Sequence, residues 1–227
     1  MGAGEGAGYH DPDGRAEERA LALRYAPAAA RDGLAALLAL DARLGAILRT
    51  TREPLIGQMR LTWWHQALVA LDHAPPPAEP MLQRLADLVV PHVAGARLAM
   101  MVEGWEVLLD PELDGAALQS HGDLRGGALF GAMATLCNSA VPQLALAGRG
   151  WALADLSRHV RDPRLAPMAR HLAQDALRAA MIDRWPTRAR AIGALTRMAW
   201  MDIQDRARPP GHPARAARLL WHRLSGR

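Results

Sequence analysis

Aromatic and β-branched residues are scarce in this sequence. Phenylalanine, tryptophan and tyrosine together make up only 4% of the chain, and phenylalanine occurs once. Strands draw heavily on these two residue classes, so the chain has little material for a β-sheet. Alanine and leucine dominate instead, and both favour helices. The composition therefore predicts an all-α fold.

Lysine is absent, so all 27 lysine-or-arginine positions are arginine. The pI is near 10.4 although the net charge is only +4, because arginine stays protonated beyond the pH at which lysine titrates. The arginines are interspersed with acidic residues, which argues against nucleic-acid binding. One local excess lies in residues 206–227, which contain no acid. This segment is either a solvated helix face or a contact for an anionic membrane surface or an acidic partner.

Cysteine is limited to Cys137, which excludes an intramolecular disulfide and fits a reducing compartment. No apolar run approaches the length of a membrane span, and the polar, glycine-rich start is no secretory signal. We therefore expect a cytoplasmic protein without a transmembrane segment, with peripheral contact at the inner membrane as a further option. Residues 1–14 are expected to form a flexible leader.

Proline and glycine breaks divide the rest of the chain into helices. Several of these begin at a proline, whose missing N–H costs nothing in the first turn. Because no repeat and no second composition regime is present, residues 15–227 are expected to form a single domain, a helical bundle. The expected helices cover residues 15–25, 27–49, 54–71, 80–90, 95–109, 124–144, 150–160, 163–182, 186–206 and 213–224.

Two of these helices carry a charged residue inside an apolar stripe. In 27–49, leucines recur at three- and four-residue steps on both sides of Asp41. In 54–71, Arg60 lies within a stripe formed by Ile56, Met59, Trp63, Ala67 and Leu71. A buried charge is costly without a partner, so each of the two is expected to have one or to face a wet cavity. The candidate is an Asp41–Arg60 ion pair across an antiparallel helix hairpin, with a structural pair that fixes helix register as the simplest interpretation.

Motifs for catalysis or metal binding are few. His171 with Asp175, and His159 with Asp162, have the spacing of two metal ligands, but neither pair has a third ligand nearby in the sequence. No glycine-rich phosphate loop precedes a helix, and no serine has a recognisable base. The residues alone therefore predict no metal site and no cofactor.

Motifs in residues 24–72 resemble the squalene/phytoene synthase family. They are an Ala-Pro-x-x-x-Arg segment, an Arg-Glu-Pro break and an Arg-Leu-x-Trp-Trp helix, here formed by Ala26, Pro27 and Arg31, by residues 52–54, and by Arg60, Leu61, Trp63 and Trp64. Two later segments, 126–129 and 148–158, resemble inner helices of the family. The sequence is most similar to a divergent subgroup that includes bacterial proteins of unassigned role and a mitochondrial assembly factor for respiratory complex I.

The resemblance implies an isoprenoid synthase fold, in which helices surround a deep central cavity. In active members, two Asp-x-x-x-Asp motifs face each other across the cavity and hold Mg²⁺, which draws the diphosphate off a prenyl substrate. Here the first motif aligns with Gly45 and Arg49, and the second begins near His159. Asp155 and Asp162 lie nearby at the wrong spacing, so both metal sites are expected to be lost.

These departures imply a degenerate synthase that binds an isoprenoid-like or quinone-like lipid or a protein partner. A role in respiratory complex assembly follows from the subgroup alone. The candidate site is a polar cluster of Asp41, Arg60, Asp155, Arg158 and His159, walled by Leu38, Trp63, Trp64, Gly127 and Phe130. One alternative is an active prenyltransferase that joins two prenyl diphosphates head to head, with Mg²⁺ ligands drawn from Asp41, Asp155, His159 and Asp162. Another is a structural helical module whose cavity has collapsed.

Overall fold

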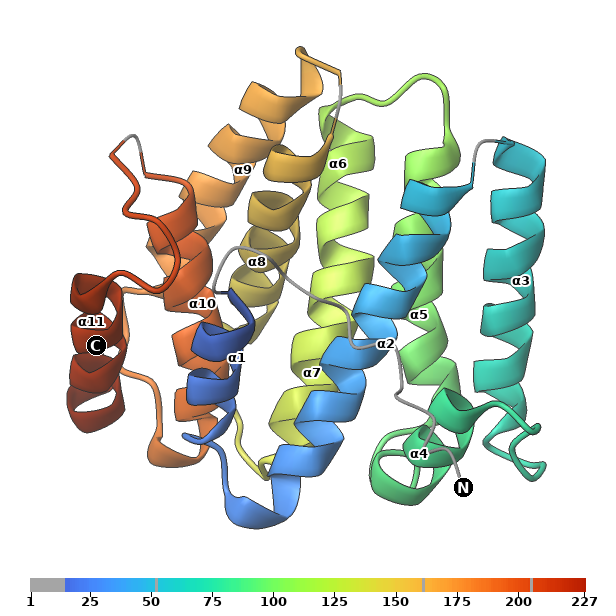
Figure 1. The fold of residues 1–227 in the computed structure, drawn as a ribbon, viewed down its shortest axis with the longest axis horizontal. Coiled ribbons are helices and arrows are strands. Elements are labelled where there is room, and N and C mark those ends of the chain that lie inside the picture. Colours follow the sequence, from blue (N-terminus) through green and yellow to red (C-terminus); the bar gives the residue numbers. More distant parts are fainter. Residues whose placement is uncertain (1–14, 52, 161, 205) are drawn as a thin grey trace, which may run out of the picture.

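The computed structural model describes residues 15–51, 53–160, 162–204 and 206–227, and in these ranges its regular structure is helical, without a strand (Figure 1). The all-α prediction is therefore confirmed, while the expected leader, 1–14, lies outside these ranges. The α-helices are α1 (Arg15–Leu23), α2 (Arg31–Thr50), α3 (Pro54–Ala70), α4 (Pro80–Leu88), α5 (Gly95–Glu106), α6 (Gly115–His121), α7 (Ala128–Leu136), α8 (Leu144–His159), α9 (Leu165–Ala180), α10 (Arg190–Asp202) and α11 (Pro213–Ser225). Shorter segments are η1 (Ala28–Ala30), η2 (Val107–Leu109), the π-helical η3 (Gly122–Gly127) and η4 (Thr187–Ala189).

The long helices lie roughly side by side. Figure 1 shows α3 at one end of the molecule and α11 at the opposite end, with α2, α5, α7, α8, α9 and α10 between them. α5 packs on α3, and α8 packs on both η3 and α9. α1 contacts α10, so the first described helix lies against the C-terminal part of the chain.

Several helix boundaries follow local sequence rules. Pro54, Pro80 and Pro213 occupy the first turns of α3, α4 and α11, as expected. Gly226 ends α11 with φ of +78°, a conformation that glycine adopts without strain, and its N–H donates to the His222 carbonyl at 2.8 Å. The two helices expected to begin at prolines 163 and 186 start a few residues later, at Leu165 and Arg190.

The segment from Gly115 to Leu136 departs most from expectation. The sequence predicts a helix over 124–144, whereas α6, η3 and α7 form one continuous helical run that begins at Gly115 and ends at Leu136. The Asp114 carboxylate starts this run by accepting from the Ala117 N–H at 2.8 Å. The next helix, α8, begins at Leu144 instead of the predicted position 150.

Two glycines allow η3 to approach its neighbouring helices closely. A Cβ on Gly126 would lie 1.9 Å from the carbonyl oxygen of Gly148 in α8, and a Cβ on Gly104 in α5 would lie 2.5 Å from the backbone nitrogen of Arg125. No side chain fits at either position without moving backbone. Arg125 is therefore held between α5 and α8.

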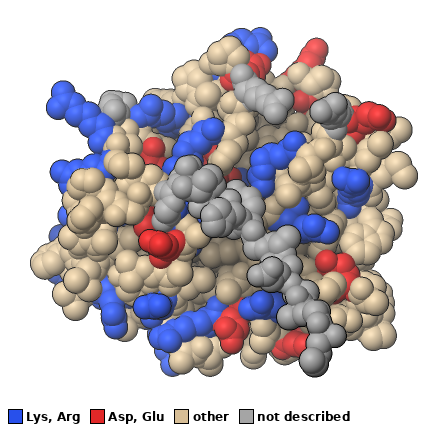
Figure 2. Space-filling model, viewed as in Figure 1, with Lys and Arg blue, Asp and Glu red and all other residues tan. Residues whose placement is uncertain are grey.

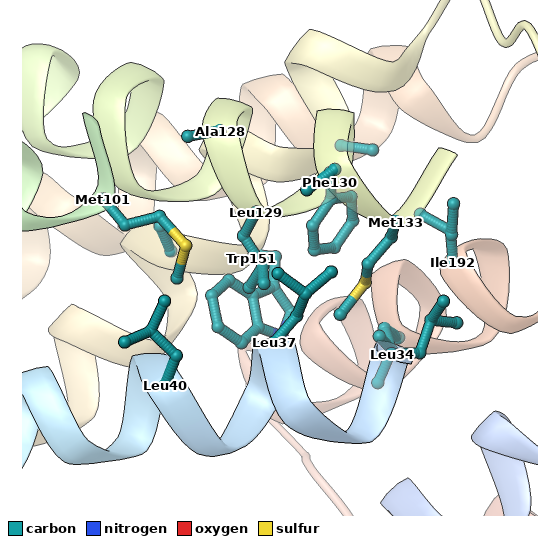
Figure 3. Close-up of a cluster of buried hydrophobic side chains, with 14 of the residues drawn as sticks. Leu34, Leu37, Leu40, Met101, Ala128, Leu129, Phe130, Met133, Trp151 and Ile192 are labelled. Carbon is teal, nitrogen blue, oxygen red and sulfur yellow. The ribbon is translucent and has the colours of Figure 1, made fainter. Parts of the chain in front are cut away.

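The core lies between α2, α5, α7, α8 and α10. Figure 3 shows its side chains converging from these helices, and all of those labelled are buried. Leucines of α2 face a set of larger side chains, and this interdigitation leaves the inner face of α2 well packed. The labelled residues are Leu34, Leu37, Leu40, Met101, Ala128, Leu129, Phe130, Met133, Trp151 and Ile192.

Helix α3 buries a different face from the one predicted. The buried residues are Gly57, Leu61, Trp64 and Leu68, whereas the predicted stripe contained Ile56, Met59 and Trp63, which are 40%, 65% and 46% exposed. For these three residues the predicted stripe is wrong by about one residue, which corresponds to a rotation of about 100°, whereas its last members, Ala67 and Leu71, are partly buried and buried, respectively. The apolar residues of α3 itself point to most sides of the helix, so their periodicity fits two registers equally well.

Arginine and acidic side chains are dispersed over the face of the molecule in Figure 2 and are not massed into one stripe. This agrees with the alternation of charge seen in the sequence. Among the helices in the described ranges, none has both the length and the hydropathy needed to cross a bilayer.

Candidate functional site

A buried ion pair joins Asp41 of α2 to Arg125 of η3. Arg125 donates from Nε to Asp41 Oδ1 at 2.7 Å and from Nη2 to Oδ2 at 2.8 Å, the two-point geometry that guanidinium and carboxylate groups favour. Trp105 donates from its indole Nε1 to Oδ1 at 3.2 Å. Because the side chains of Asp41 and Arg125 are only 8% and 2% exposed, the pair is shielded from water.

Arg60 is not the partner of Asp41, so the predicted pair is wrong. The Arg60 side chain is exposed on α3 and donates to Thr51 Oγ1 at 3.4 Å. The shift in the register of α3 is the reason, because it turns Arg60 away from the bundle interior. The expectation that Asp41 either has a partner or faces a wet cavity is nonetheless confirmed, because Arg125 is its partner.

Arg125 also links Asp41 to a second carboxylate, Asp155 of α8. Its Nη2 donates to Asp155 Oδ2 at 2.8 Å, and its guanidinium carbon lies 4.0 Å and 4.9 Å from the ring centroids of Trp105 and Trp151. Burial alone would lower the pKa of Arg125, but the two carboxylates outweigh burial and hold this pKa above its ordinary value. A permanently charged guanidinium therefore lies between α2 and α8.

Asp155 is compensated by arginine on both of its oxygens. Arg158, one turn further along α8, donates from Nη2 to Asp155 Oδ1 at 3.0 Å. Burial raises the pKa of Asp155, but the charges of Arg125 and Arg158 more than offset it, so the pKa lies below its usual range. His159 lies beside this group, with Nδ1 donating to the Asp155 backbone carbonyl at 2.8 Å. Asp155 is therefore ionised at neutral pH.

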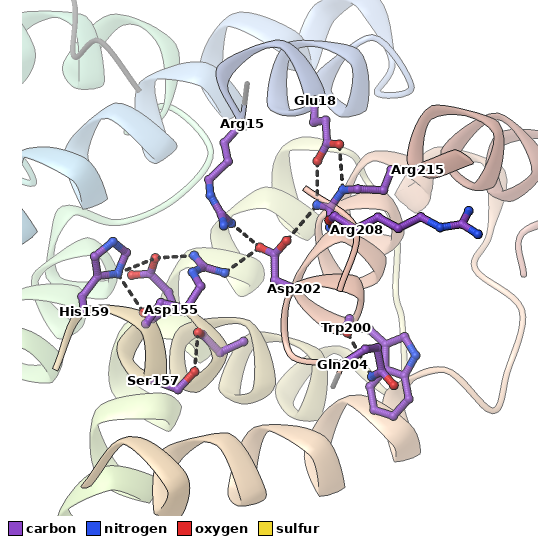
Figure 4. A network of polar contacts seen from close by, with 12 residues as sticks. Arg15, Glu18, Asp155, Ser157, His159, Trp200, Asp202, Gln204, Arg208 and Arg215 are labelled. Atoms are coloured by element: carbon purple, nitrogen blue, oxygen red, sulfur yellow. Dashed lines mark hydrogen bonds and ion pairs between the residues drawn. The ribbon is translucent and has the colours of Figure 1, made fainter. Parts of the chain in front are cut away.

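The ion pairs continue from Arg158 toward both ends of the described chain (Figure 4). Asp202 of α10 accepts from Arg158 at 2.5 Å, from Arg215 of α11 at 2.8 Å, and from Arg15 of α1. Arg215 also donates to Glu18 of α1 at 2.8 Å and 2.7 Å. The central ion network, as we call it, consists of Glu18, Asp41, Asp155 and Asp202 with Arg15, Arg125, Arg158 and Arg215.

The two carboxylates on either side of Arg125 do not fit a magnesium site. Mg²⁺ binds carboxylate oxygens directly, yet every carboxylate oxygen of Asp41 and Asp155 already accepts from an arginine. The positions that the resemblance assigns to the first metal motif, Gly45 and Arg49, lie further along α2 and carry no acid. Within the described ranges, no three His, Cys, Asp or Glu side chains come together as metal ligands.

The remaining His and Asp candidates are surface residues. His171 Nε2 lies 3.5 Å from Asp175 Oδ2 on the exposed side of α9. Asp162, considered as a ligand beside His159, instead forms an exposed ion pair with Arg164 at 2.9 Å. Each contact is satisfied locally and requires no metal.

The aromatic part of the predicted site lies apart from the central ion network. Arg60, Trp63 and Trp64 line a groove of about 450 Å³ between α2 and α3, together with Ile47 of α2. The two indole rings meet edge to face with centroids 5.3 Å apart. The structure therefore separates the predicted residues into a group at the central ion network (Asp41, Asp155 and Arg158, with the exposed His159 beside them) and a group at the α2–α3 groove (Arg60, Trp63 and the buried Trp64).

The other predicted wall residues have different surroundings. Phe130 is fully buried, and its ring centroid lies 5.7 Å from that of Trp151. Leu38 is partly buried against the core, whereas a Cβ on Gly127 would meet nothing within 4 Å. Beside Asp155, between α8 and α10, a small pocket of about 20 Å³ has room for about one water molecule.

Sequence reasoning missed Arg125, although a signal for it is present. Arg125 stands alone among glycines and apolar residues in the segment Leu-Arg-Gly-Gly-Ala-Leu-Phe, which is the same kind of isolated charge that drew attention to Asp41. Asp202, in Ala-Trp-Met-Asp-Ile, carries a similar signal. Glu18 and Arg215 lie in charged segments, so nothing in the sequence distinguishes them from surface residues.

Comparisons with known proteins identify the family. A model of the squalene/phytoene synthase family matches residues 13–162, a range that contains α1 to α8 and with them Asp41, Arg125 and Asp155. A search of curated proteins and a search of solved structures each gave no match. The helical architecture is that expected of an isoprenoid synthase-like fold. Because the matched residues form more than half of its length, the chain belongs to the squalene/phytoene synthase family.

Proposed function

We propose that this family member does not condense prenyl diphosphates and instead binds an isoprenoid-like or quinone-like lipid. The observation that carries the proposal is Arg125, whose guanidinium bridges Asp41 of α2 and Asp155 of α8. Condensation requires a cation that is free to bind the diphosphate leaving group as charge develops on it. Here the cation between the two helices is part of the chain and is already neutralised by the carboxylates.

The buried environment makes this arrangement hard to displace. Removing one partner from a buried ion pair costs about 3–5 kcal/mol, so a metal that took over either carboxylate would have to compensate for that loss. Trp105 adds a hydrogen bond to Asp41, and its ring lies against the guanidinium. These contacts support a structural role for the two carboxylates.

The groove between α2 and α3 supports the lipid-binding part of the proposal. Its volume of about 450 Å³ is within the usual range for small-molecule sites. Trp63 and Ile47 offer apolar surface, and Arg43 and Arg60 offer donors for a polar head group such as a quinone carbonyl. An amphipathic lipid matches this combination.

A cytoplasmic location with peripheral contact at the inner membrane is part of the same proposal. A lipid ligand would be reached most easily from a bilayer surface, and the sequence resembles a subgroup that includes a respiratory complex I assembly factor. A protein partner in such an assembly is consistent with the exposed apolar residues of α3, Leu55, Ile56, Met59 and Trp63. The role in respiratory complex assembly itself is drawn from the resemblance.

The first experiment addresses the chemistry. The full chain is incubated with farnesyl or geranylgeranyl diphosphate and Mg²⁺, and pyrophosphate release and apolar products are measured. We expect neither to exceed the level without protein. Pyrophosphate release together with an apolar product would overturn the proposal and favour the active prenyltransferase.

The second experiment addresses the ligand. Native mass spectrometry of gently purified protein should detect a bound prenyl lipid, and a short-chain ubiquinone should raise the melting temperature. Trp63→Ala should weaken binding about tenfold, which is the loss expected for one good aromatic contact. The control is Ile182→Ala, just after α9 and outside the groove, where the side chain is 74% exposed. Absence of any bound lipid and of any thermal shift would contradict lipid binding.

A further inference from the structure

A second pocket, distant from α3, has an unusual charge. It measures about 410 Å³ and is lined by residues of the α1–α2 connection, η4, the first turns of α2 and α10, and the end of α11. No aspartate or glutamate of the described ranges lines it. Among the described residues, none of its arginines forms an ion pair. These arginines are Arg24, Arg31, Arg188, Arg190 and Arg223.

Backbone hydrogen bonds fix the position of two of these arginines. Arg190 donates to the carbonyls of Trp185 and His222 at 2.8 Å each and to that of Arg223 at 2.7 Å. Arg31 donates to the carbonyl of Ala26 at 3.2 Å. Carbonyl oxygens satisfy the N–H groups but leave the positive charge uncompensated. Burial and the charge of Arg184 lower the pKa of Arg190, in agreement with a region of excess positive charge.

Tyr25, which lines the same pocket, has a buried hydroxyl without a hydrogen-bond partner. Tyr25 is 8% exposed, and its hydroxyl makes no hydrogen bond in the structure. Leaving a buried hydroxyl unpaired is costly, so such a group calls for a ligand. Burial raises the pKa of Tyr25, with the charge of Arg223 acting in the opposite direction. The hydroxyl therefore remains protonated at neutral pH and is available as a donor.

We propose that this pocket binds a phosphate group. Guanidinium groups bind phosphate oxygens through paired, charge-assisted hydrogen bonds. Arg188 and Arg223 are exposed, and within the described part of the chain their side chains donate no hydrogen bond to the backbone. The Tyr25 hydroxyl supplies a further donor. This site is separate from the central ion network and from the α2–α3 groove, so it does not depend on the proposed function.

Two sources of the phosphate share this chemistry, a phosphorylated small molecule and a lipid head group. The outward face of α11 next to Arg223 is apolar, with Leu220, Trp221 and Leu224 exposed by 51%, 56% and 71%. Arg218, on the opposite flank of this face, is also exposed. Apolar residues flanked by arginine are typical of helices that lie on an anionic membrane surface, so the experiment has an arm for each source.

The first arm uses inorganic phosphate. The melting temperature and calorimetric binding of the full chain are measured with phosphate and with chloride at the same ionic strength. We expect a saturable rise with phosphate only. Arg188→Gln/Arg223→Gln should weaken binding by about tenfold or more, because two charged donors are lost. Arg84→Gln/Arg97→Gln, which removes two exposed arginines on α4 and α5, should bind like the wild type.

The second arm uses vesicles of phosphatidylcholine with and without phosphatidic acid, analysed by co-sedimentation. Binding that requires phosphatidic acid and is lost in Arg188→Gln/Arg223→Gln supports the site with a lipid as its source. Phosphate binding with no vesicle binding supports it with a soluble source. The proposal is overturned if neither ligand binds, or if the Arg84→Gln/Arg97→Gln control loses binding as much as the pocket variant.

Discussion

Arg125 is surrounded by two carboxylates and two indole rings and is almost without contact to water. Such a charge is tolerated only when its partners are well oriented. The network around it is balanced, since its four guanidinium groups are matched by four carboxylates. At the scale of single residues, therefore, the loss of one member should cost more than a typical surface ion pair.

Asp41→Ala tests this expectation. The variant leaves Arg125 buried with only Asp155 as a carboxylate partner, so it should lower the free energy of unfolding by about 3 kcal/mol or more, measured by urea denaturation. Asp123→Ala is the matched control, because Asp123 accepts from Arg149 with the same two-point geometry at 2.6 Å and 2.8 Å but is exposed. The control should lose about 1 kcal/mol at most. Equal losses would mean that the Asp41 pair is solvated.

The lowered pKa of the buried His121 should make the free energy of unfolding depend on pH. Burial, and then the charge of Arg125, lowers its pKa from 6.5 to about 3, and its Nδ1 donates to the Gly104 carbonyl at 2.7 Å. Between these two pKa values the unfolded ring binds a proton that the folded ring does not. Stability should therefore fall as the pH is lowered below about 6.5, by up to about 1.4 kcal/mol per pH unit.

Urea denaturation between about pH 7 and pH 5 measures this slope. His222, whose pKa is lowered to about 4 mainly by burial, should add to it, whereas Asp155 should contribute only below about pH 4, because its pKa is lowered from 3.8. His121→Gln keeps a hydrogen-bond donor but cannot titrate. The dependence of its unfolding free energy on pH should therefore be less steep, by up to about 1.4 kcal/mol per pH unit, which is the contribution of one proton. An unchanged slope in His121→Gln would contradict the assignment.

The sequence revealed only part of the candidate site. Asp41 could be identified as buried because it is an isolated charge in an apolar stripe, and this pattern depends only on the sequence of its own helix. The identity of the partner depends on which helices face each other. Arg60 was plausible because α2 and α3 are consecutive, but Arg125 reaches Asp41 from a segment that lies 84 positions away.

At the scale of helices, composition and helix breakers predicted most of the fold. Prolines act locally, so the positions of α3 and α11, which begin at Pro54 and Pro213, could be derived from the sequence. The π-helical η3 could not, because it depends on close contact between Gly126 and the Gly148 carbonyl of another helix. The buried face of α3 could not be predicted either, because apolar residues of this helix point to most of its sides.

The adjacent tryptophans of α3 test the corrected register. Trp64 is 4% exposed and Trp63 is 46% exposed, so Trp64→Ala should cost about 3–5 kcal/mol and Trp63→Ala less than about 1 kcal/mol. Chemical denaturation of both variants, monitored by helical circular dichroism, gives the two values. The opposite order would restore the stripe inferred from the sequence and would place Arg60 toward the bundle.

At the scale of the whole molecule, the central ion network joins segments that are far apart in the chain. Asp202 of α10 forms ion pairs with Arg15 of α1, Arg158 of α8 and Arg215 of α11. Arg215 also forms an ion pair with Glu18 of α1. The two ends of the described chain are therefore held to α8 through one carboxylate, and residues on different helices should affect stability jointly.

A double-mutant cycle of Asp202→Asn and Glu18→Gln measures this coupling. When both carboxylates are present, each limits the freedom of Arg215, and once one is neutralised the other is the remaining carboxylate of this pair that binds it. The two losses in unfolding free energy should therefore differ from additivity by more than about 0.5 kcal/mol. The parallel cycle of Asp202→Asn with Asp123→Ala shares no arginine, since Asp123 binds Arg149, and should be additive within about 0.5 kcal/mol. Additivity in both cycles would show that the contacts of Figure 4 act as independent pairs, and the chain ends would then be held mainly by apolar packing of α1 and α11 on α10.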